Sequence, residues 1–279
     1  MVRPAKIPAT HVVLDIDNTL LCTVGVVHVL YCTGIMTKAE YLEVRNRLYV
    51  LHMNENPPGM CRMEDEEGNK FNYDGLYEMW GVIRPYCADF LRACFERFQY
   101  VIIWTAGGEE YATKVCKVLF KDVPFYPHLI WSFHDCQPIP KTEGVQKPLA
   151  KLAAHLGIDV EHLLLIDDNP LSAISCPSLM SQIKPFRLPG ELLELNLTME
   201  DAFQLQVNLE KPHHPSLMRQ PILPIHKTIG QWLLKEDNIL ARMATVLRDN
   251  KMSGCSSQEF IAAFIDAKTC VPYGTSLRA

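Results

Sequence analysis

Two carboxylates that directly follow an apolar run are the feature that most constrains this sequence. The run His11 to Leu14 has the composition of a strand, and it continues as Asp15-Ile16-Asp17-Asn18-Thr19-Leu20. Residues i and i+2 of an extended chain share a face, so Asp15 and Asp17 would leave the strand on the same side. Each then raises the pKa of the other unless a cation or a proton intervenes. The pattern predicts a metal-assisted carboxylate nucleophile with a proton-transferring partner, and a solvated turn is the alternative.

Two later apolar runs also end in polar residues. The run 100–104 is followed by Thr105, and the run 162–166 is followed by Asp167 and Asp168. Runs that are apolar on both faces are typical of parallel strands covered by helices, and residues 84–98, 109–120 and 147–157 have helical spacing. The sequence therefore predicts an α/β fold with a Rossmann-like open parallel sheet, whose ligands bind beyond the carboxyl ends of the strands.

The segment between the first two motifs is less regular. We expect a strand at 24–31, an amphipathic helix at 37–51 and an exposed loop at 54–68. Asp74-Gly75 lies between two short aromatic-rich runs, 70–73 and 76–80, which predicts a hairpin. The aromatic side chains of this insert either contact an extended, proline-containing peptide or pack the hairpin against the sheet: Phe71, Tyr73, Tyr77 and Trp80. A further short strand is expected at 128–133.

The C-terminal third has a different organisation. We expect a last helix of the main domain at 191–207, a proline-containing linker at 211–224, and an amphipathic helix at 226–247. Ser256-Ser257-Gln258-Glu259 is a capping-box pattern that precedes another helix. The predicted domains are 1–208, with an insert at approximately 22–82, and a helical extension at 209–279. The extension is expected to pack onto the domain, and partner binding is the alternative.

Composition limits the classes of function. The 279-residue chain has a net charge of −5, so no general basic field favours nucleic acid or an anionic membrane. We therefore expect neither direct nucleic-acid binding nor membrane association, and the sequence carries no signal for an oligomeric state. The start of the chain lacks the pattern of a signal peptide or a membrane span. Ten cysteines without a Cys-x-x-Cys pair favour reduced thiols in the cytoplasm or nucleus.

The polar residues at the three strand ends fit phosphate chemistry. Four carboxylates in one crevice call for a hard cation such as Mg²⁺, which binds substrate phosphate as well. The hydroxyl of Thr105 and the backbone of Ala106 can meet phosphate oxygens, and Lys147 at a helix start can neutralise the charge that develops in transfer.

The ordered motifs resemble the haloacid dehalogenase superfamily of aspartate-nucleophile phosphatases. Within it, residues 8–195 look like the RNA polymerase II C-terminal-domain phosphatases, or NLI-interacting-factor-like family. The similar motifs are Ile83-Arg84-Pro85-Tyr86 with Phe90-Leu91, Ile103-Trp104-Thr105-Ala106 with Tyr111-Ala112, Lys147-Pro148-Leu149, and Ile166-Asp167-Asp168-Asn169-Pro170. Asn18 stands where the relatives usually have Glu, and Asp168-Asn169-Pro170 replaces their usual Asn-Ser-Pro.

The resemblance implies a role for each site residue. Asp15 is the nucleophile that forms an aspartyl-phosphate, and Asp17 is the general acid/base, whose carbonyl also binds Mg²⁺. The phosphate-binding residues are Thr19, Thr105, Ala106 and Lys147, and the metal site comprises Asp15, Asp17, Asp167 and Asp168. The expected substrate is a phosphoserine or phosphothreonine protein or peptide. The alternatives are a phosphatase of small metabolites or nucleic-acid ends, and a phosphate-binding adaptor without turnover.

Overall fold

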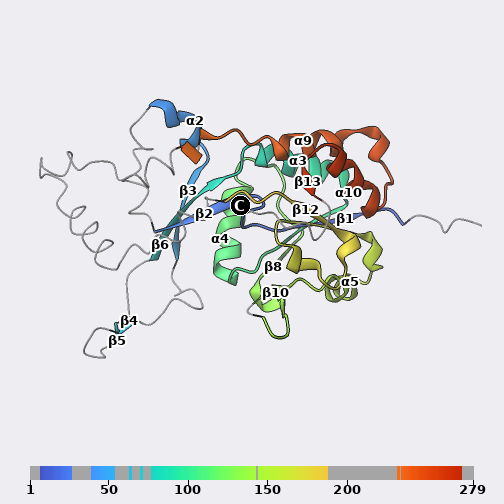
Figure 1. The fold of residues 1–279 in the computed structure, drawn as a ribbon, viewed down its shortest axis with the longest axis horizontal. Coiled ribbons are helices and arrows are strands. Elements are labelled where there is room, and N and C mark those ends of the chain that lie inside the picture. Colours follow the sequence, from blue (N-terminus) through green and yellow to red (C-terminus); the bar gives the residue numbers. More distant parts are fainter. Residues whose placement is uncertain are drawn as a thin grey trace, which may run out of the picture.

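A six-stranded sheet forms the centre of the computed structural model, which describes residues 7–26, 39–53, 63–64, 70–71, 77–142, 144–187, 231–232 and 234–271 (Figure 1). Its strand order is β13-β12-β11-β1-β7-β8. Five strands are parallel, and β13 (Cys270–Val271) pairs antiparallel with β12. The parallel strands are β1 (His11–Leu14), β7 (Tyr100–Trp104), β8 (Leu129–Trp131), β11 (Leu163–Asp167) and β12 (Met180–Ile183). The predicted open parallel sheet is confirmed.

Both faces of the central sheet are covered. Val12 and Leu14 of β1 belong to one hydrophobic cluster, whereas Val13 between them belongs to the other. Helices α3 (Cys87–Arg97) and α4 (Glu109–Leu119) contribute to the first cluster, and α5 (Leu149–Leu156) contributes to the second. Because β1, β7 and β11 are parallel neighbours, the residues at their carboxyl ends lie at one edge of the sheet.

The predicted helix boundaries in this part are close to the observed ones. α5 is followed by Gly157, which has a left-handed backbone conformation with a φ of 67°. Glycine adopts this conformation more readily than other residues, so it is common at helix C-termini. Short 3₁₀ helices connect several elements: η1 (Ala39–Tyr41), η2 (Phe133–Asp135), η3 (Val160–His162), η4 (Pro170–Ala173), η5 (Pro177–Leu179) and η7 (Asn250–Met252). A two-stranded ribbon of β9 (Gln137–Pro138) and β10 (Val145–Gln146) precedes α5.

A second, antiparallel sheet with the order β2-β6-β3 lies beside the central one (Figure 1). It comprises β2 (Leu21–Val26), β6 (Tyr77–Ile83) and β3 (Leu48–Met53). The predicted helix over 37–51 is therefore wrong beyond residue 45: only η1 and α2 (Leu42–Arg45) are helical in its described part. Tyr49, Leu51 and Met53 are buried while the residues between them are exposed, a period of two that pairing with β6 satisfies.

The hairpin of the insert forms at a different place from the one expected. β5 (Lys70–Phe71) pairs with β4 (Met63–Glu64), whereas both edges of β6 are taken by β2 and β3. The insert thus contains a small hairpin, but the pairing across Asp74-Gly75 is wrong, and the expected loop over 54–68 includes β4. Trp80 is fully buried, so the packing alternative holds for this side chain and it does not face a substrate. Tyr73 and residues 27–31 of the expected strand lie outside the described residues.

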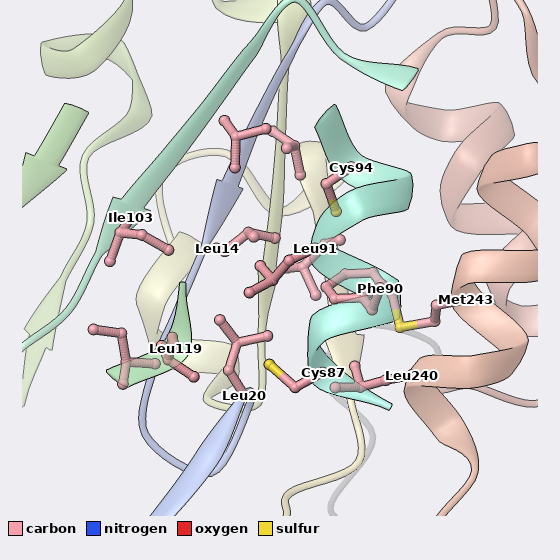
Figure 2. Close-up of a cluster of buried hydrophobic side chains, with 14 of the residues drawn as sticks. Leu14, Leu20, Cys87, Phe90, Leu91, Cys94, Ile103, Leu119, Leu240 and Met243 are labelled. Carbon is pink, nitrogen blue, oxygen red and sulfur yellow. The ribbon is translucent and has the colours of Figure 1, made fainter. Parts of the chain in front are cut away.

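The C-terminal helices pack onto the domain, as expected. Figure 2 shows Leu240 and Met243 of α9 (Ile239–Arg248) beside Phe90 of α3, within the larger hydrophobic cluster. α10 (Ser257–Asp266) begins with the predicted capping box, in which the Ser256 amide donates to Glu259 Oε2 at 2.9 Å. The predicted continuous helix over 226–247 is wrong at 235–238, which are not helical.

The remaining expectations for this part of the chain are not tested. The expected helix at 191–207 and linker at 211–224 lie outside the described residues, and the division at residue 208 stays a prediction. Among the helices that the structure describes, none is long and apolar enough to cross a membrane.

Candidate active site

A cleft of about 580 Å³ lies at the carboxyl ends of β1, β7 and β11. Most of the residues predicted for the site line it, and they come from separate segments that the parallel sheet brings to one edge. The lining residues are Asp15, Asp17, Asn18, Ala106, Val145, Lys147, Asp167, Asp168, Asn169, Pro170, Ser172, Gln182, Pro185 and Arg187.

Lys147 joins the ends of β1 and β11. Its Nζ donates to Asp15 Oδ1 at 2.5 Å and to Asp167 Oδ2 at 2.6 Å, and all three side chains are buried. The Lys147 amide donates to the Ser172 carbonyl at 2.8 Å, which fixes the backbone before α5. Burial opposes the charge of Lys147, but the two carboxylates outweigh burial and raise its pKa, so the lysine is a permanent cation.

The Asp15 carboxyl lies in a strongly acidic environment. Burial raises its pKa well above the ordinary value, Asp167 raises it further, and Lys147 opposes both. Burial and then Asp167 also raise the pKa of Asp168, to about 7. One ammonium group therefore faces three carboxyl groups, and the ionised forms of Asp15 and Asp168 need further positive charge.

This arrangement fits a divalent cation. Asp15, Asp167 and Asp168 each offer an oxygen, and these three atoms lie within 4.8 Å of one another. Oxygen ligands on a partly open site suit Mg²⁺, which keeps several waters and takes only a few carboxylates. The Asp17 side chain is not part of this oxygen cluster. The resemblance implied that Asp17 binds the metal through its backbone carbonyl, and that role stays a prediction.

Asp17 instead belongs to a hydroxyl network. Its Oδ1 accepts from the Tyr111 hydroxyl at 2.5 Å and from Thr23 Oγ1 at 3.4 Å, and its Oδ2 accepts from Thr105 Oγ1 at 3.3 Å. Thr23 also contacts the hydroxyls of Tyr111 at 2.7 Å and Tyr49 at 2.9 Å. Burial raises the pKa of Asp17, and the hydrogen bonds from Tyr111 and Thr105 oppose that rise. The second carboxylate is thus held by residues of both sheets and of α4.

The four predicted phosphate-binding residues separate into two pairs. Ala106 and Lys147 line the cleft. Thr19 and Thr105 are fully buried and are not among the lining residues. Thr19 Oγ1 accepts from the Asp168 amide at 3.1 Å, and Thr105 Oγ1 accepts from the Gly107 amide at 2.9 Å. In this structure both hydroxyls hold the loops that carry the site.

Arg84 supports the site through partners that the sequence did not indicate. Its buried guanidinium donates to the carbonyls of Thr19 at 3.0 Å and Lys184 at 2.9 Å, and it pairs with Asp237 at 3.0 Å. The sequence placed Arg84 at a helix start and in a family motif, but it had no signal for these partners, which lie 65, 100 and 153 residues away. Tyr111 was likewise predicted only as part of a helix and a motif.

Comparison with known proteins identifies the family. A sequence-family model described as NLI interacting factor-like phosphatase matches residues 10–202, and the chain belongs to this family. The resemblance noted in the motifs is therefore confirmed, and membership supports a phosphatase of the haloacid dehalogenase type. No curated protein matches the sequence.

Solved structures share the fold. One is fission yeast RNA polymerase II CTD phosphatase Fcp1, an arginine-to-alanine variant bound to beryllium fluoride, with 17% identity and a TM-score of 0.53 over 86% of this chain and 62% of that one. Another is Fcp1 described as an essential RNA polymerase II CTD phosphatase, with 19% identity and a TM-score of 0.52 over 86% and 61%. The chain thus spans about three fifths of the length of these structures.

Proposed function

We propose that the chain is a Mg²⁺-dependent phosphatase that hydrolyses phosphoserine or phosphothreonine of a protein through an aspartyl-phosphate on Asp15. The observation that carries the proposal is the pair of carboxylates at the end of β1. Asp15 lines the cleft and is held by Lys147 at 2.5 Å, whereas Asp17 has separate partners in Tyr111 and Thr105. Two neighbouring carboxylates in different environments suit two different roles in one reaction.

The first half of the reaction forms the covalent intermediate. A carboxylate oxygen of Asp15 attacks the phosphorus atom, and the bond from phosphorus to the ester oxygen breaks. Asp17 donates its proton to the departing oxygen, for which a pKa raised by burial is favourable. Lys147 neutralises part of the charge on the phosphoryl oxygens, and Ala106, which also lines the cleft, offers its backbone amide to them.

The second half releases phosphate. Asp17, now ionised, takes a proton from a water molecule, whose oxygen attacks the phosphorus atom. The bond between phosphorus and the Asp15 oxygen breaks, which returns the free carboxylate and yields inorganic phosphate. When bound by Asp15, Asp167 and Asp168, Mg²⁺ supplies charge neutralisation for the phosphoryl group and for the crowded carboxylates.

The protein substrate is supported by the relatives. The two structures that share the fold are described as CTD phosphatases of RNA polymerase II, and their substrate is thus part of a polypeptide. A phosphatase of metabolites or nucleic-acid ends would use the same catalytic set, because fold and chemistry do not fix the substrate. A binding module without turnover would not require both Asp15 and Asp17 beside Lys147.

A substrate panel with a matched variant tests the proposal. Phosphoserine peptides, sugar phosphates, nucleotides and an aryl phosphate are compared with and without Mg²⁺, using the wild type, Asp15→Asn and the exposed control Asp266→Asn. We expect the highest kcat/KM for phosphopeptides, no turnover in excess chelator, and none by Asp15→Asn, because an amide does not form the aspartyl-phosphate. Substantial hydrolysis by Asp15→Asn contradicts the covalent mechanism, and faster hydrolysis of metabolites contradicts the substrate.

A further inference from the structure

A second cavity, of about 310 Å³, lies beside the active-site cleft. It is formed by the segment after β12, the start of α9 and the segment between α10 and β13. Pro185 lines both spaces, so a single stretch of backbone separates them. The catalytic carboxylates are not among the described residues that line this second cavity.

The cavity has an excess of positive charge. Its cationic lining residues are Lys184, Lys235, Arg242 and Lys268, and its two carboxylates are Glu236 and Asp237. Asp237 is already paired with the buried guanidinium of Arg84 at 3.0 Å. The remaining charges therefore favour an anionic ligand, and multiple cations around a small cavity are suited to a phosphate dianion.

Arg242 adds an unsatisfied donor. Its Nε is buried and has no hydrogen-bond partner among the residues that the structure describes. A buried donor of a charged group that lacks an acceptor is costly, and Arg242 also contributes its positive charge to the cavity lining.

Lys268 lies on the cavity wall in an unusual backbone conformation. It has a φ of 57° at the end of α10, where its amide donates to the Ile265 carbonyl at 2.8 Å and the Thr269 amide donates to the Phe264 carbonyl at 3.0 Å. This is the Schellman pattern, whose left-handed residue is usually glycine. A lysine in this conformation is strained, yet it places a cation on the cavity wall.

The wall between the two spaces is fixed by aromatic packing. The Phe186 ring packs against Trp232, with the ring centroids 5.0 Å apart. The guanidinium carbon of Arg84 lies over the same Phe186 ring, 5.5 Å from its centroid. The Phe186 amide donates to the Asn18 carbonyl at 2.6 Å. A ligand in the cavity therefore lies a fixed distance from the loop that carries Asp17 and Asn18.

We propose that this cavity is a second phosphate-binding subsite, which takes one phosphate monoester of a peptide whose other phosphate enters the Asp15 cleft. The inference rests on the proposed function and extends it: the preferred substrate carries two closely spaced phosphates. Free inorganic phosphate would meet the same cationic side chains as a phosphate group on a peptide. The experiment distinguishes these two ligands.

The test uses the full chain and synthetic peptides of one sequence that carry one phosphate or two, at a series of spacings. We expect one spacing at which the doubly phosphorylated peptide has about tenfold higher kcat/KM, mainly through a lower KM. Lys268→Gly and Lys235→Gln should remove this advantage and leave hydrolysis of the singly phosphorylated peptide unchanged. Lys251→Gln, at an exposed lysine elsewhere, is the matched control. Lys268→Gly should also raise Tm, because glycine relieves the left-handed strain, so lost preference is not a sign of unfolding.

Calorimetry supplies the second arm. Inorganic phosphate is titrated into the wild type and the Lys268→Gly/Lys235→Gln double variant. Loss of a phosphate site in the variant without any preference for doubly phosphorylated peptide supports the subsite and assigns it to free phosphate. No preference at any spacing, together with unchanged phosphate binding, overturns the inference.

Failure of the proposed function gives a different result. If the wild type hydrolyses none of the peptides, the phosphatase assignment falls, but the subsite is still measured by peptide binding. In that case tighter binding of the doubly phosphorylated peptide, lost in Lys268→Gly, supports the subsite, and equal binding of both peptides overturns it.

Discussion

The two main sheets of the molecule differ in which faces are buried. Every residue of β1 in the central sheet is buried, whereas β3 in the outer sheet alternates between buried and exposed residues. The central sheet places Asp15 and Asp167 at the carboxyl ends of β1 and β11, and both side chains are buried. The outer sheet reaches the site through two hydroxyls, Thr23 and Tyr49, which belong to the hydrogen-bond network of Asp17. We infer that the central sheet provides the reacting groups and that the outer sheet adjusts one of them.

Among changes that compare the two sheets, the largest effect is expected at Asp17, which has hydrogen-bond partners near both of them. Asp17→Asn retains the volume and accepts hydrogen bonds through its amide oxygen, but it does not transfer the proton. We expect kcat to fall by about 10²- to 10⁴-fold with little change in Tm. Steady-state hydrolysis of a phosphopeptide measures the loss, and hydrolysis of an aryl phosphate with a good leaving group should be less affected. An equal loss on both substrates would contradict the role of Asp17 as an acid.

A matched valine-to-alanine pair compares the stability of the two sheets. Val13 of β1 is fully buried, and Val50 of β3 is 39% exposed. Val13→Ala removes two buried methyl groups and leaves a cavity, so we expect a loss of about 2–3 kcal/mol in the free energy of unfolding. Val50→Ala should cost less than about 1 kcal/mol. Urea unfolding measures both, and similar losses would show that the outer face of β3 is covered in solution.

The same difference explains which elements the sequence predicts. A strand buried on both faces is a continuous apolar run, so β1, β7 and β11 are visible locally, and their shared edge follows from parallel pairing. β3 was missed because Tyr41, Val44, Leu48 and Leu51 also satisfy helical spacing. Its pairing with β6, some thirty residues away, decides the outcome. That contact has no local signal.

The sequence predicted the site residues that lie at strand ends, but it did not predict their partners from other parts of the chain. Asp15, Lys147, Asp167 and Asp168 meet because strand ends and a helix start converge. The partners of Asp17 and of Arg84 depend on side-chain directions across α4, the outer sheet and the C-terminal segment, which a single sequence does not specify. For this reason the phosphate-binding role of Thr19 stays a prediction, whereas its hydrogen bond to the Asp168 backbone is observed.

A pH series tests the electrostatics of the central sheet's edge. Burial and Asp167 raise the pKa of Asp168 from the ordinary 3.8 to about 7, so the folded protein binds this proton more tightly than the unfolded chain. In metal-free protein this group therefore lowers stability as pH rises from about 4 to about 7. Mg²⁺ requires the ionised form, so we expect its affinity to fall about tenfold per pH unit below about 7. Calorimetric titration and Tm measure the two effects.

Asp168→Asn is the control for the pH series. The amide does not titrate, so the step near pH 7 should disappear from both the Mg²⁺ affinity and the metal-free Tm, although Mg²⁺ binds more weakly at every pH. A wild-type Mg²⁺ affinity that does not change between about pH 6 and 8 would contradict the raised pKa of Asp168.

The smallest effect is expected in the hydroxyl network, and it tests how the outer sheet acts on the site. The Tyr111 hydroxyl donates directly to Asp17 at 2.5 Å, whereas the Tyr49 hydroxyl reaches Asp17 only through Thr23. Tyr111→Phe removes one hydrogen bond that favours the carboxylate form, worth about 1–3 kcal/mol for a charged acceptor, so it should raise the pKa of Asp17. Because Asp17 acts as an acid in the first step, the alkaline limb of the pH profile of kcat/KM should move to higher pH. Tyr49→Phe removes only an indirect contact, so we expect less than about threefold change in kcat and no shift of that limb. If Tyr49→Phe moves the pH profile as far as Tyr111→Phe does, the outer sheet controls the protonation of Asp17 rather than its position.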